Sequence, residues 1–227
     1  MSEPHRDPSR VETTDAQDEE FDVLDSMGNR TGLRKPRGSV HRDGDWHAAI
    51  HIWVGSLVDG VSTVVLQRRS STKDTWPGRV DIAVGGHLSA GEGLDEGMRE
   101  AREEIGLELS LDDVTVLGRR FVRSSPNDNE VQDVFAVRAD LPLDAFTPHP
   151  LEVDALLQLP IADAIALLSG LVGSAEAVER ARDATEEQTI ILTADAFVPE
   201  ASPYYAVALA ALDRVVAGKP IERFLLR

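Results

Sequence analysis

The sequence predicts an α/β domain in which helices cover a mixed β-sheet. The chain of 227 residues contains many short segments rich in β-branched residues, bounded by glycine, proline, asparagine or aspartate. One helical segment, 94–105, interrupts these strands, and further helical patterns follow near the C-terminus. Strands around one helix, with more helices at the end, favour a sheet that is covered by helices.

The order of the elements follows from alternating apolar residues and from the turn residues between them. Strands are expected at 21–25, 31–34, 47–57, 62–69, 80–84, 114–122, 131–139 and 151–159. Loops or turns are expected at 35–47, 70–79, 85–86, 124–129 and 142–150. Helices are expected at 94–105, 160–168, 175–187 and 206–216. Pro160 suits the first position of its helix, and Gly218 is a stop signal for the last one.

The domain organisation follows from length and from the contrast between the N-terminus and the rest of the chain. Residues 1–18 are polar, acidic and nearly devoid of apolar side chains, so we expect a disordered acidic tail. Residues 19–227 are expected to form a single domain with a helical C-terminal extension. The apolar residues of the last helix favour core packing, and a homodimer surface stays open as the alternative; they are Tyr204, Tyr205, Leu209 and Leu212.

Composition and charge restrict the classes of function. A formal net charge of −17 argues against nucleic acid or an anionic membrane as a partner, because both require basic surface. A small anionic diphosphate substrate is still compatible, since a bound metal ion reverses the local field. The chain has no cysteine, no signal-peptide pattern and no apolar run near the roughly 20 residues of a membrane span. We therefore expect a cytoplasmic protein.

The segment 85–107 carries the strongest chemical signal. On a helix, residues three and four apart share a face, so the apolar residues form one stripe of Leu94, Met98, Ala101 and Ile105. The carboxylates form a second stripe of Glu96, Glu100 and Glu103, with Glu104 beside it. Like charges at this spacing destabilise a helix by roughly a few tenths of a kcal/mol per pair. A hard cation with oxygen ligands is expected to compensate. Gly97, inside the helix, indicates tight packing or a local distortion.

The second half of this segment resembles the motif of the Nudix hydrolases without a gap, from Arg99-Glu100 through Glu103-Glu104 to Gly106-Leu107. In the first half Gly86 and Glu92 match, but six residues instead of seven separate Glu92 from Arg99. The resemblance implies an α/β/α sandwich with a mixed β-sheet and a catalytic helix that follows a Gly-Gly turn. It also implies a metal-dependent hydrolase that cleaves a diphosphate bond in a nucleoside diphosphate derivative or a similar phosphometabolite. Mg²⁺ or Mn²⁺ is the implied cofactor.

The candidate site residues follow from charge and spacing and from this resemblance. The expected metal ligands are Glu100, Glu103 and Glu104, with the carbonyl of Gly86 added by resemblance. Glu103, Glu104 and Arg99 are the catalytic candidates, and Arg99 is expected to hold a glutamate through a charge-assisted hydrogen bond. The general base stays open among Glu103, Glu104, Glu130 and Glu152. Candidates for contacting substrate are Lys35, Arg37, Arg68, Arg69, Arg79 and His87, and for each arginine a surface charge is the alternative.

The flanking segments resemble the isopentenyl-diphosphate isomerase-like branch of the superfamily; they are 21–25, 35–38, 40–44, 76–78 and 86–92. By that resemblance His41, His47 and His87 correspond approximately to metal-binding histidines, and hydrogen bonding to the loop backbone or contact with substrate is the alternative. The isomerase uses a cysteine for acid–base chemistry, and this chain has none, which argues against that activity. A non-catalytic nucleotide-binding module is the other alternative, and the intact glutamates argue against it. Trp46 and Trp76, in expected loops, either pack at the rim or stack on a base.

Overall fold

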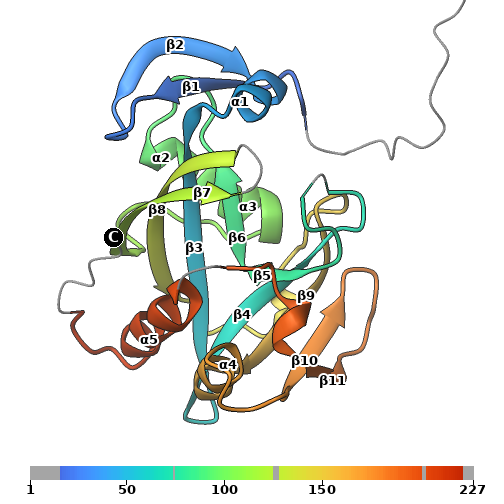
Figure 1. Cartoon of the computed structure of the whole chain (residues 1–227). Helices are drawn as coiled ribbons and strands as arrows, with labels where there is room; N and C mark the ends of the chain where they lie inside the picture. The colour runs from blue at the N-terminus through green and yellow to red at the C-terminus, as the bar shows by residue number, and fades with distance from the viewer. Residues whose placement is uncertain (1–15, 74, 125–127, 201–202, 222–227) are drawn as a thin grey trace, which may run out of the picture.

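The sheet of this protein is arranged around one long strand, β3 (Trp46–Val58). The computed structural model describes residues 16–73, 75–124, 128–200 and 203–221 (Figure 1). The other strands are β1 (Glu20–Leu24), β2 (Arg30–Pro36), β4 (Val61–Arg69), β5 (Val80–Ile82), β6 (Val84–His87), β7 (Thr115–Ser124), β8 (Asp128–Arg138), β9 (Val153–Pro160), β10 (Ala175–Ala181) and β11 (Gln188–Leu192). The helices are α1 (Arg37–Asp43), α2 (Leu94–Gly97), α3 (Arg99–Ile105), α4 (Ile161–Leu168) and α5 (Tyr204–Val216), with short 3₁₀ helices η1 (Leu143–Ala145) and η2 (Ala194–Ala196).

The sheet is mixed because β3 pairs with strands that run in both directions. It is antiparallel to β6 over its first half and to β4 over its second half, and it is parallel to β8. Beyond β4 the sheet continues through β9, β10 and β11, and beyond β8 it ends at β7. The short strand β6 is therefore placed at the centre of the molecule, next to the strand that carries most of the pairing.

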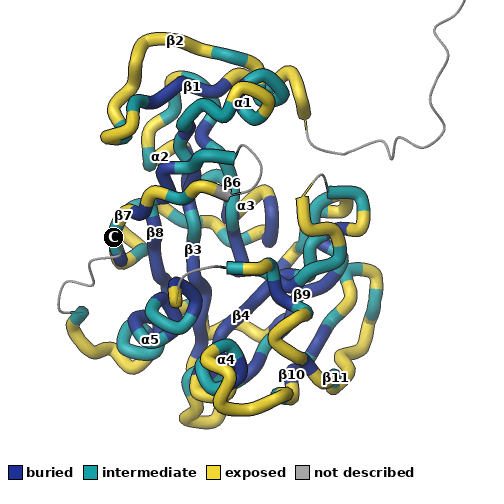
Figure 2. The backbone as a smooth tube through the Cα atoms, viewed as in Figure 1, coloured by how far each residue is buried: buried dark blue, intermediate teal, exposed yellow. Residues whose placement is uncertain are grey.

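Alternation along β3 divides the core into two clusters, because successive side chains of a strand point to opposite faces of the sheet. Ile50 and Ile52 pack against the apolar stripe of the α2–α3 segment. Trp53 points to the other face and packs against α4 and α5. Figure 2 shows β3, β4 and β8 as a buried centre with helices around it. The predicted α/β fold with a mixed sheet and helices on both faces is confirmed.

The last helix belongs to the core, as the sequence favours. Tyr204, Tyr205, Leu209 and Leu212 of α5 are all buried and belong to the cluster that contains Trp53. The start of the helix is fixed to the sheet by hydrogen bonds. Trp53 Nε1 donates to the Tyr204 hydroxyl at 3.0 Å, and His51 Nδ1 lies 2.9 Å from the same oxygen. His51 is therefore a structural residue of the interior, as its strand position predicts.

The N-terminal elements β1, β2 and α1 form a small lobe at one end of the sheet, at the top of Figure 1. This lobe has a minimal core of Phe21, Val23 and Val40. The prediction of a continuous loop over 35–47 is wrong, because α1 occupies seven of these residues and ends at Gly44 in the left-handed conformation. A single buried residue, Val40, anchors this helix, so its sequence carries no apolar periodicity that could have revealed it.

Two other elements differ from their sequence predictions. The segment 175–187 is not a helix, because its first seven residues form β10. This strand forms an antiparallel hairpin with β11, which follows the segment, and Ala175 lies opposite Leu192 and Glu179 opposite Gln188. Pairing with β9 overrides the helical preference of the alanines and glutamates. The predicted Gly-Gly turn is also wrong, because Gly85 and Gly86 lie inside β6 and pair with β3.

Most of the predicted acidic tail lies outside the described residues, which begin at Ala16. The part of it that is described contacts the lobe, where the Gly38 amide donates to the carbonyl of Gln17 at 3.1 Å. Within the described ranges, each helix is too short or too polar to cross a lipid bilayer.

Candidate active site

The apolar stripe of the acidic segment determines which carboxylates face the sheet. Met98, Ala101 and Ile105 are buried against the β3 side of the core, so the predicted stripe is confirmed. The segment is divided into α2 and α3, with Met98 between them in helical conformation. Gly97 is required by tight packing, because a Cβ at this position would overlap the side chain of Leu88. This close approach packs α2 against Leu88, the residue that follows β6.

Gly86 is the point at which α3 meets β6. A Cβ on Gly86 would overlap the carboxyl group of Glu100, so only glycine allows this carboxylate to lie against the strand. The neighbouring Gly85 is less crowded, since a Cβ there would meet Ile82 and His51 at 3.5 and 3.7 Å. The family resemblance places Gly86 next to the glutamates, and the structure supplies the steric reason.

Glu104 is the most deeply buried carboxylate of the segment. Its Oε2 accepts hydrogen bonds from Gln67 Nε2 at 2.8 Å and from the Gly85 amide at 3.1 Å. Gln67 was not predicted as a site residue. A signal for it exists in the sequence, because Gln67 occupies a core-facing position of β4, two residues after the buried Val65.

Glu100 and Glu104 both have raised pKa values, and the charge of Glu100 is one cause of the rise at Glu104. Burial raises the pKa of Glu100 to about 7; the neighbouring Arg99 lowers it, and the charges of Glu103 and Glu152 raise it. Burial also raises the pKa of Glu104 well above its ordinary range, with Glu100 and Glu152 as further causes. Two buried carboxylates side by side are costly unless a cation neutralises them. These donors are hard oxygens, which suit Mg²⁺ or Mn²⁺.

Arg99 donates hydrogen bonds to three of the glutamates. Its Nε and Nη2 donate to the two oxygens of Glu92, both at 2.8 Å, in a bidentate pair. Its Nη1 donates to Glu100 at 2.5 Å and to Glu103 at 3.0 Å. The Glu92 carboxylate therefore reaches Arg99 although one residue is missing between them, and the hydrogen bonds from Arg99 lower the pKa of Glu92. The missing residue between Glu92 and Arg99 is accommodated where α2 ends and α3 begins.

The carboxylates considered as general base lie in three different places. Glu103 points outward, with its side chain 46% exposed, and is held by Arg99. Glu152 faces Glu100 and Glu104, and its Oε2 accepts a hydrogen bond from Lys73 Nζ at 3.1 Å. Glu130 is directed to the opposite face of the sheet. Of Glu130, which lies in β8, and Glu152, only Glu152 belongs to the acidic centre.

Glu130 is part of a second polar cluster, formed by the three histidines and Asp128. Ligand atoms of His41, His47, His87 and Asp128 all lie within 4.8 Å of one another. They come from α1, β3, β6 and β8, so the sheet and the N-terminal lobe meet here. His47 is fully buried and its Nε2 makes no hydrogen bond to the described residues, which is the state of a ligand atom that lacks its partner.

The protonation of His87 follows from its two neighbours. Arg37 Nη1 lies 3.3 Å from Nδ1, and Glu130 Oε1 lies 2.9 Å from Nε2. A guanidinium only donates hydrogen bonds, so Nδ1 accepts and Nε2–H donates to Glu130. Burial lowers the pKa of His87 to about 3, which keeps the ring neutral at physiological pH. A neutral imidazole is the form that binds metal ions.

The basic residues that were candidates for substrate contact are mostly engaged elsewhere. Lys35 pairs with Asp43 and Asp45 at 3.1 and 2.5 Å. Arg68 donates to Glu179 at 2.5 and 2.8 Å. Arg69 pairs with Asp81 at 3.2 Å. The structure brings Arg37 and His87 together in the histidine cluster, and it places Lys73, which sequence reasoning missed, next to the acidic centre.

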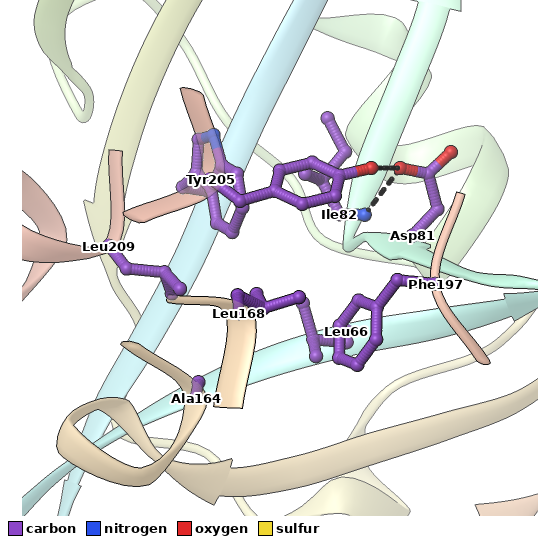
Figure 3. A pocket seen from close by; sticks show the side chains of 9 residues that line it. Leu66, Asp81, Ile82, Ala164, Leu168, Phe197, Tyr205 and Leu209 are labelled. Atoms are coloured by element: carbon purple, nitrogen blue, oxygen red, sulfur yellow. Dashed lines mark hydrogen bonds between the residues drawn. The ribbon is translucent and has the colours of Figure 1, made fainter. Parts of the chain in front are cut away.

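An apolar hollow lies between α4, α5 and the sheet, apart from both polar centres (Figure 3). Its lining includes Leu66, Ile82, Leu168 and Leu209, and it leaves no room for a water-sized molecule. It is a feature of core packing and contributes no ligand site.

Comparisons with known proteins agree with this geometry. A family model described as NUDIX domain matches residues 49–181. A protein of Arabidopsis thaliana called Nudix hydrolase 3 is 42% identical over 151 residues, which are 63% of this chain but 19% of that longer protein. An uncharacterised Nudix hydrolase of Clostridium acetobutylicum is 28% identical over 202 residues, covering 86% of this chain and 98% of that one.

An isomerase and a solved structure are also similar to this chain. The isopentenyl-diphosphate Delta-isomerase of Escherichia coli O127:H6 is 29% identical over 161 residues, covering 68% of this chain and 82% of the isomerase. A crystal structure from Deinococcus radiodurans shares the fold, with a TM-score of 0.51, 18% identity, and coverage of 67% of this chain and 90% of that one. The family match spans more than half of the chain, including β6, α2 and α3. The chain belongs to the Nudix family.

Proposed function

We propose that this protein is a divalent-metal-dependent hydrolase that cleaves the diphosphate bond of a nucleoside diphosphate derivative. The observation that carries the proposal is the buried pair Glu100 and Glu104 beside Gly86. Burial raises the pKa values of both carboxyls, and the charge of Glu100 raises that of Glu104 further, so a bound cation would stabilise their ionised forms. A purely structural helix gains nothing from this arrangement.

The residues that would hold Mg²⁺ are Glu100 and Glu104, with the backbone of Gly86 adjacent to Glu100. A bound Mg²⁺ neutralises phosphoryl charge and lowers the pKa of a coordinated water. Arg99 fixes the carboxylate of Glu100 by its hydrogen bond at 2.5 Å and keeps Glu103 and Glu92 beside it. Gln67 holds one oxygen of Glu104, so the direction of its carboxylate is also fixed.

Glu152 is the general base in this proposal. A water oxygen bonds to one phosphorus of the diphosphate, its proton passes to Glu152, and the bridging P–O bond breaks to release a phosphorylated product. Glu152 suits this role because it faces Glu100 and Glu104 from outside α3, where a water between them can be reached. Lys73 donates to its carboxylate at 3.1 Å and keeps it oriented.

The test compares Glu100→Gln, Glu104→Gln and Glu152→Gln with the control Glu108→Gln, an exposed acid beyond α3. Each is assayed for hydrolysis of a panel of nucleoside diphosphate derivatives across a Mg²⁺ titration. Loss of either buried carboxylate should lower kcat/KM by about 100-fold or more, equivalent to about 3 kcal/mol. Glu152→Gln should lower kcat with unchanged Mg²⁺ affinity. Turnover of Glu104→Gln within a few-fold of wild type would contradict the proposal.

An isomerase activity like that of the Escherichia coli relative is disfavoured. The segment before His87 reads Val84-Gly85-Gly86, and the chain contains no cysteine to carry the acid–base step that the resemblance implies. A purely nucleotide-binding module is disfavoured by the intact pair Glu100 and Glu104. An assay with isopentenyl diphosphate, which should show no isomerisation, tests the first alternative directly.

The histidine cluster supports a second proposed metal site. Three imidazoles and a carboxylate from four elements, His41, His47, His87 and Asp128, match the donors of Zn²⁺ or a similar transition metal. Because His87 Nε2–H donates to Glu130 at 2.9 Å, which orients the ring, Nδ1 is the atom that would bind the metal, in place of its contact with Arg37 Nη1 at 3.3 Å. Metal analysis of the purified protein, with His47→Ala as comparison, tests this site.

A further inference from the structure

Trp76 is the most unusual residue of the loop between β4 and β5. Its backbone has a φ of +51°, in the left-handed region that bulky residues rarely adopt. Pro77 follows it and restricts its backbone further. Its side chain is 44% exposed, so burial of the indole does not offset this cost. Strain of this kind persists only where the surrounding structure enforces it, and it is concentrated at functional sites.

The residue before Trp76 is held by a chain of hydrogen bonds that leads back to the core. Arg69 donates to the carbonyl of Thr75 at 3.1 Å and to its hydroxyl at 3.2 Å. The same guanidinium is anchored by Asp81 at 3.2 Å. Asp81 in turn accepts from the hydroxyl of Tyr205 at 3.0 Å, the dashed contact in Figure 3. The residue before Trp76 is therefore fixed to the sheet and to α5, while the indole is left outside.

The other tryptophans of the chain show what a structural indole looks like here. Trp53 is 1% exposed, donates to Tyr204 and packs edge-on against two tyrosine rings. Trp46 packs against Phe121 and lies under the guanidinium of Arg123 at 5.3 Å. Among the described residues, no aromatic ring or cation packs on Trp76. At 44% exposure, part of its surface is available to a ligand.

The first residues of the loop that carries Trp76 border the acidic centre. The Ser70 amide donates to the carbonyl of Glu152 at 2.8 Å, and Lys73 Nζ lies 3.1 Å from the Glu152 carboxylate. Trp76 follows Lys73 by three residues, so the Cα atoms of the two residues are at most about 11 Å apart. In Figure 1 this loop lies across from α3, on the side where β9 begins. A nucleotide whose diphosphate lies at the acidic centre extends over a comparable length.

We propose that Trp76 is the platform on which the nucleobase of the substrate stacks. This inference rests on the proposed function, because it takes the diphosphate to lie at Glu100 and Glu104. An indole is a strong stacking partner for a flat ring and tolerates any base, since every base has a π face. The strained backbone holds the ring outward before substrate arrives, which reduces the entropy lost on binding. Trp76 thus determines a preference for nucleotides over diphosphates that lack a base.

Binding without turnover tests this directly. The probes are α,β-methylene-ADP, which has a base and cannot be cleaved between its phosphates, and methylenediphosphonate, which has none. With Mg²⁺ present, α,β-methylene-ADP should quench the fluorescence of wild type and of Trp46→Phe, and the quench should be lost in Trp76→Phe. Trp76→Ala should raise the Kd of α,β-methylene-ADP by about tenfold or more, the size expected for loss of one stacked base. The Kd of methylenediphosphonate should stay unchanged.

A variant at the same position separates binding from folding. Trp76→Gly removes the ring and also relieves the left-handed strain, so Tm should not fall while the preference for α,β-methylene-ADP disappears. A lower Tm with unchanged nucleotide affinity would overturn the inference, as would a quench that survives in Trp76→Phe. An equal loss of affinity for both probes would also overturn it. If wild type binds α,β-methylene-ADP through Trp76 but hydrolyses no diphosphate, the proposed function fails and the stacking site stands.

Discussion

The acidic centre and the histidine cluster occupy opposite faces of the same short strand. Gly86 of β6 faces α3 and admits the carboxyl of Glu100, while His87, the next residue, points to the other face and joins His41 and His47. The two centres differ in charge. Burial raises the pKa values of Glu100 and Glu104, whereas it lowers those of His47 and His87, and the ring of Phe21 stacks on His47 at 5.4 Å.

From this difference we expect the acidic centre to depend on a cation for its chemistry and the histidine cluster to serve mainly structure. A metal bound by the histidine cluster would strengthen the junction between the lobe and the sheet, because its four donors come from α1, β3, β6 and β8. Paired buried carboxylates store electrostatic repulsion that a cation at the site relieves. Breaking the acidic centre should therefore abolish turnover, and breaking the histidine cluster should mainly lower stability.

The largest effect is expected from adding one methyl group to β6. Gly86→Ala places a Cβ on the carboxyl of Glu100 and must displace it, so kcat/KM should fall by about 1000-fold, equivalent to about 4 kcal/mol. Gly85→Ala is the matched control, because its Cβ meets Ile82 and His51 at ordinary contact distances of 3.5 and 3.7 Å. Steady-state kinetics of both variants checks this. Equal activities of the two would contradict the steric argument.

The next effect is a pH-dependent change of stability at Glu100. The folded pKa of about 7 lies above the ordinary value of 4.5, so the unfolded state ionises first as pH rises. Ionisation therefore costs native stability between pH 4.5 and 7, by about 3 kcal/mol in total, and no more is lost above pH 7. The Tm of Glu100→Gln minus that of wild type should rise across this range by about 8 °C and then level.

Mg²⁺ provides the control for that titration. A cation binds the ionised carboxylates, so saturating Mg²⁺ should reduce the Tm difference between Glu100→Gln and wild type at pH 8 and leave it unchanged at pH 4.5. Thermal melts of both proteins in buffers from pH 4.5 to 8.5, with Mg²⁺ or with EDTA, measure the effect. A Tm difference that is independent of pH would show that burial does not raise this pKa.

A smaller effect is expected at the histidine cluster. Zn²⁺ at about 100 times its Kd should raise the Tm of wild type by about 5 °C or more, through binding to the folded state alone. His47→Ala removes one of the four donors and should abolish this shift, while hydrolysis at the acidic centre persists. The control is His149→Ala, which alters a partly exposed histidine outside the cluster. A Zn²⁺ shift that survives in His47→Ala would argue against the site.

The smallest effect concerns Arg99. Lysine keeps the charge but cannot form the bidentate pair with Glu92 while also reaching Glu100 and Glu103. Arg99→Lys should therefore lower kcat/KM by about tenfold, or about 1.4 kcal/mol, with little change in fold. Arg102→Lys, an exposed arginine on the same helix, is the control and should match wild type. Kinetics at saturating Mg²⁺ compares the two.

Part of this architecture could be predicted because its physical causes are local. The strands around 47–57 and 62–69 alternate, and the spacing of Met98, Ala101 and Ile105 defines a helical face, so both could be inferred from the sequence. The errors arose where distant pairing overrides local preference. The hairpin of β10 and β11 exists because β9 pairs with β10, and nothing within 175–187 indicates that partner.

The sequence by itself determined the chemistry that is available: carboxylates three and four residues apart on one helix, a glycine pair before them, three histidines and no cysteine. Only the tertiary structure decided how these groups are used. It buries Glu104 against Gln67, turns Glu103 outward, and separates Glu152 from Glu130 onto different faces of the sheet. The physical reason is that burial shifts the pKa of a carboxyl. Whether a carboxyl is buried depends on which strand packs against it, and contacts between distant segments of the chain determine where that strand lies.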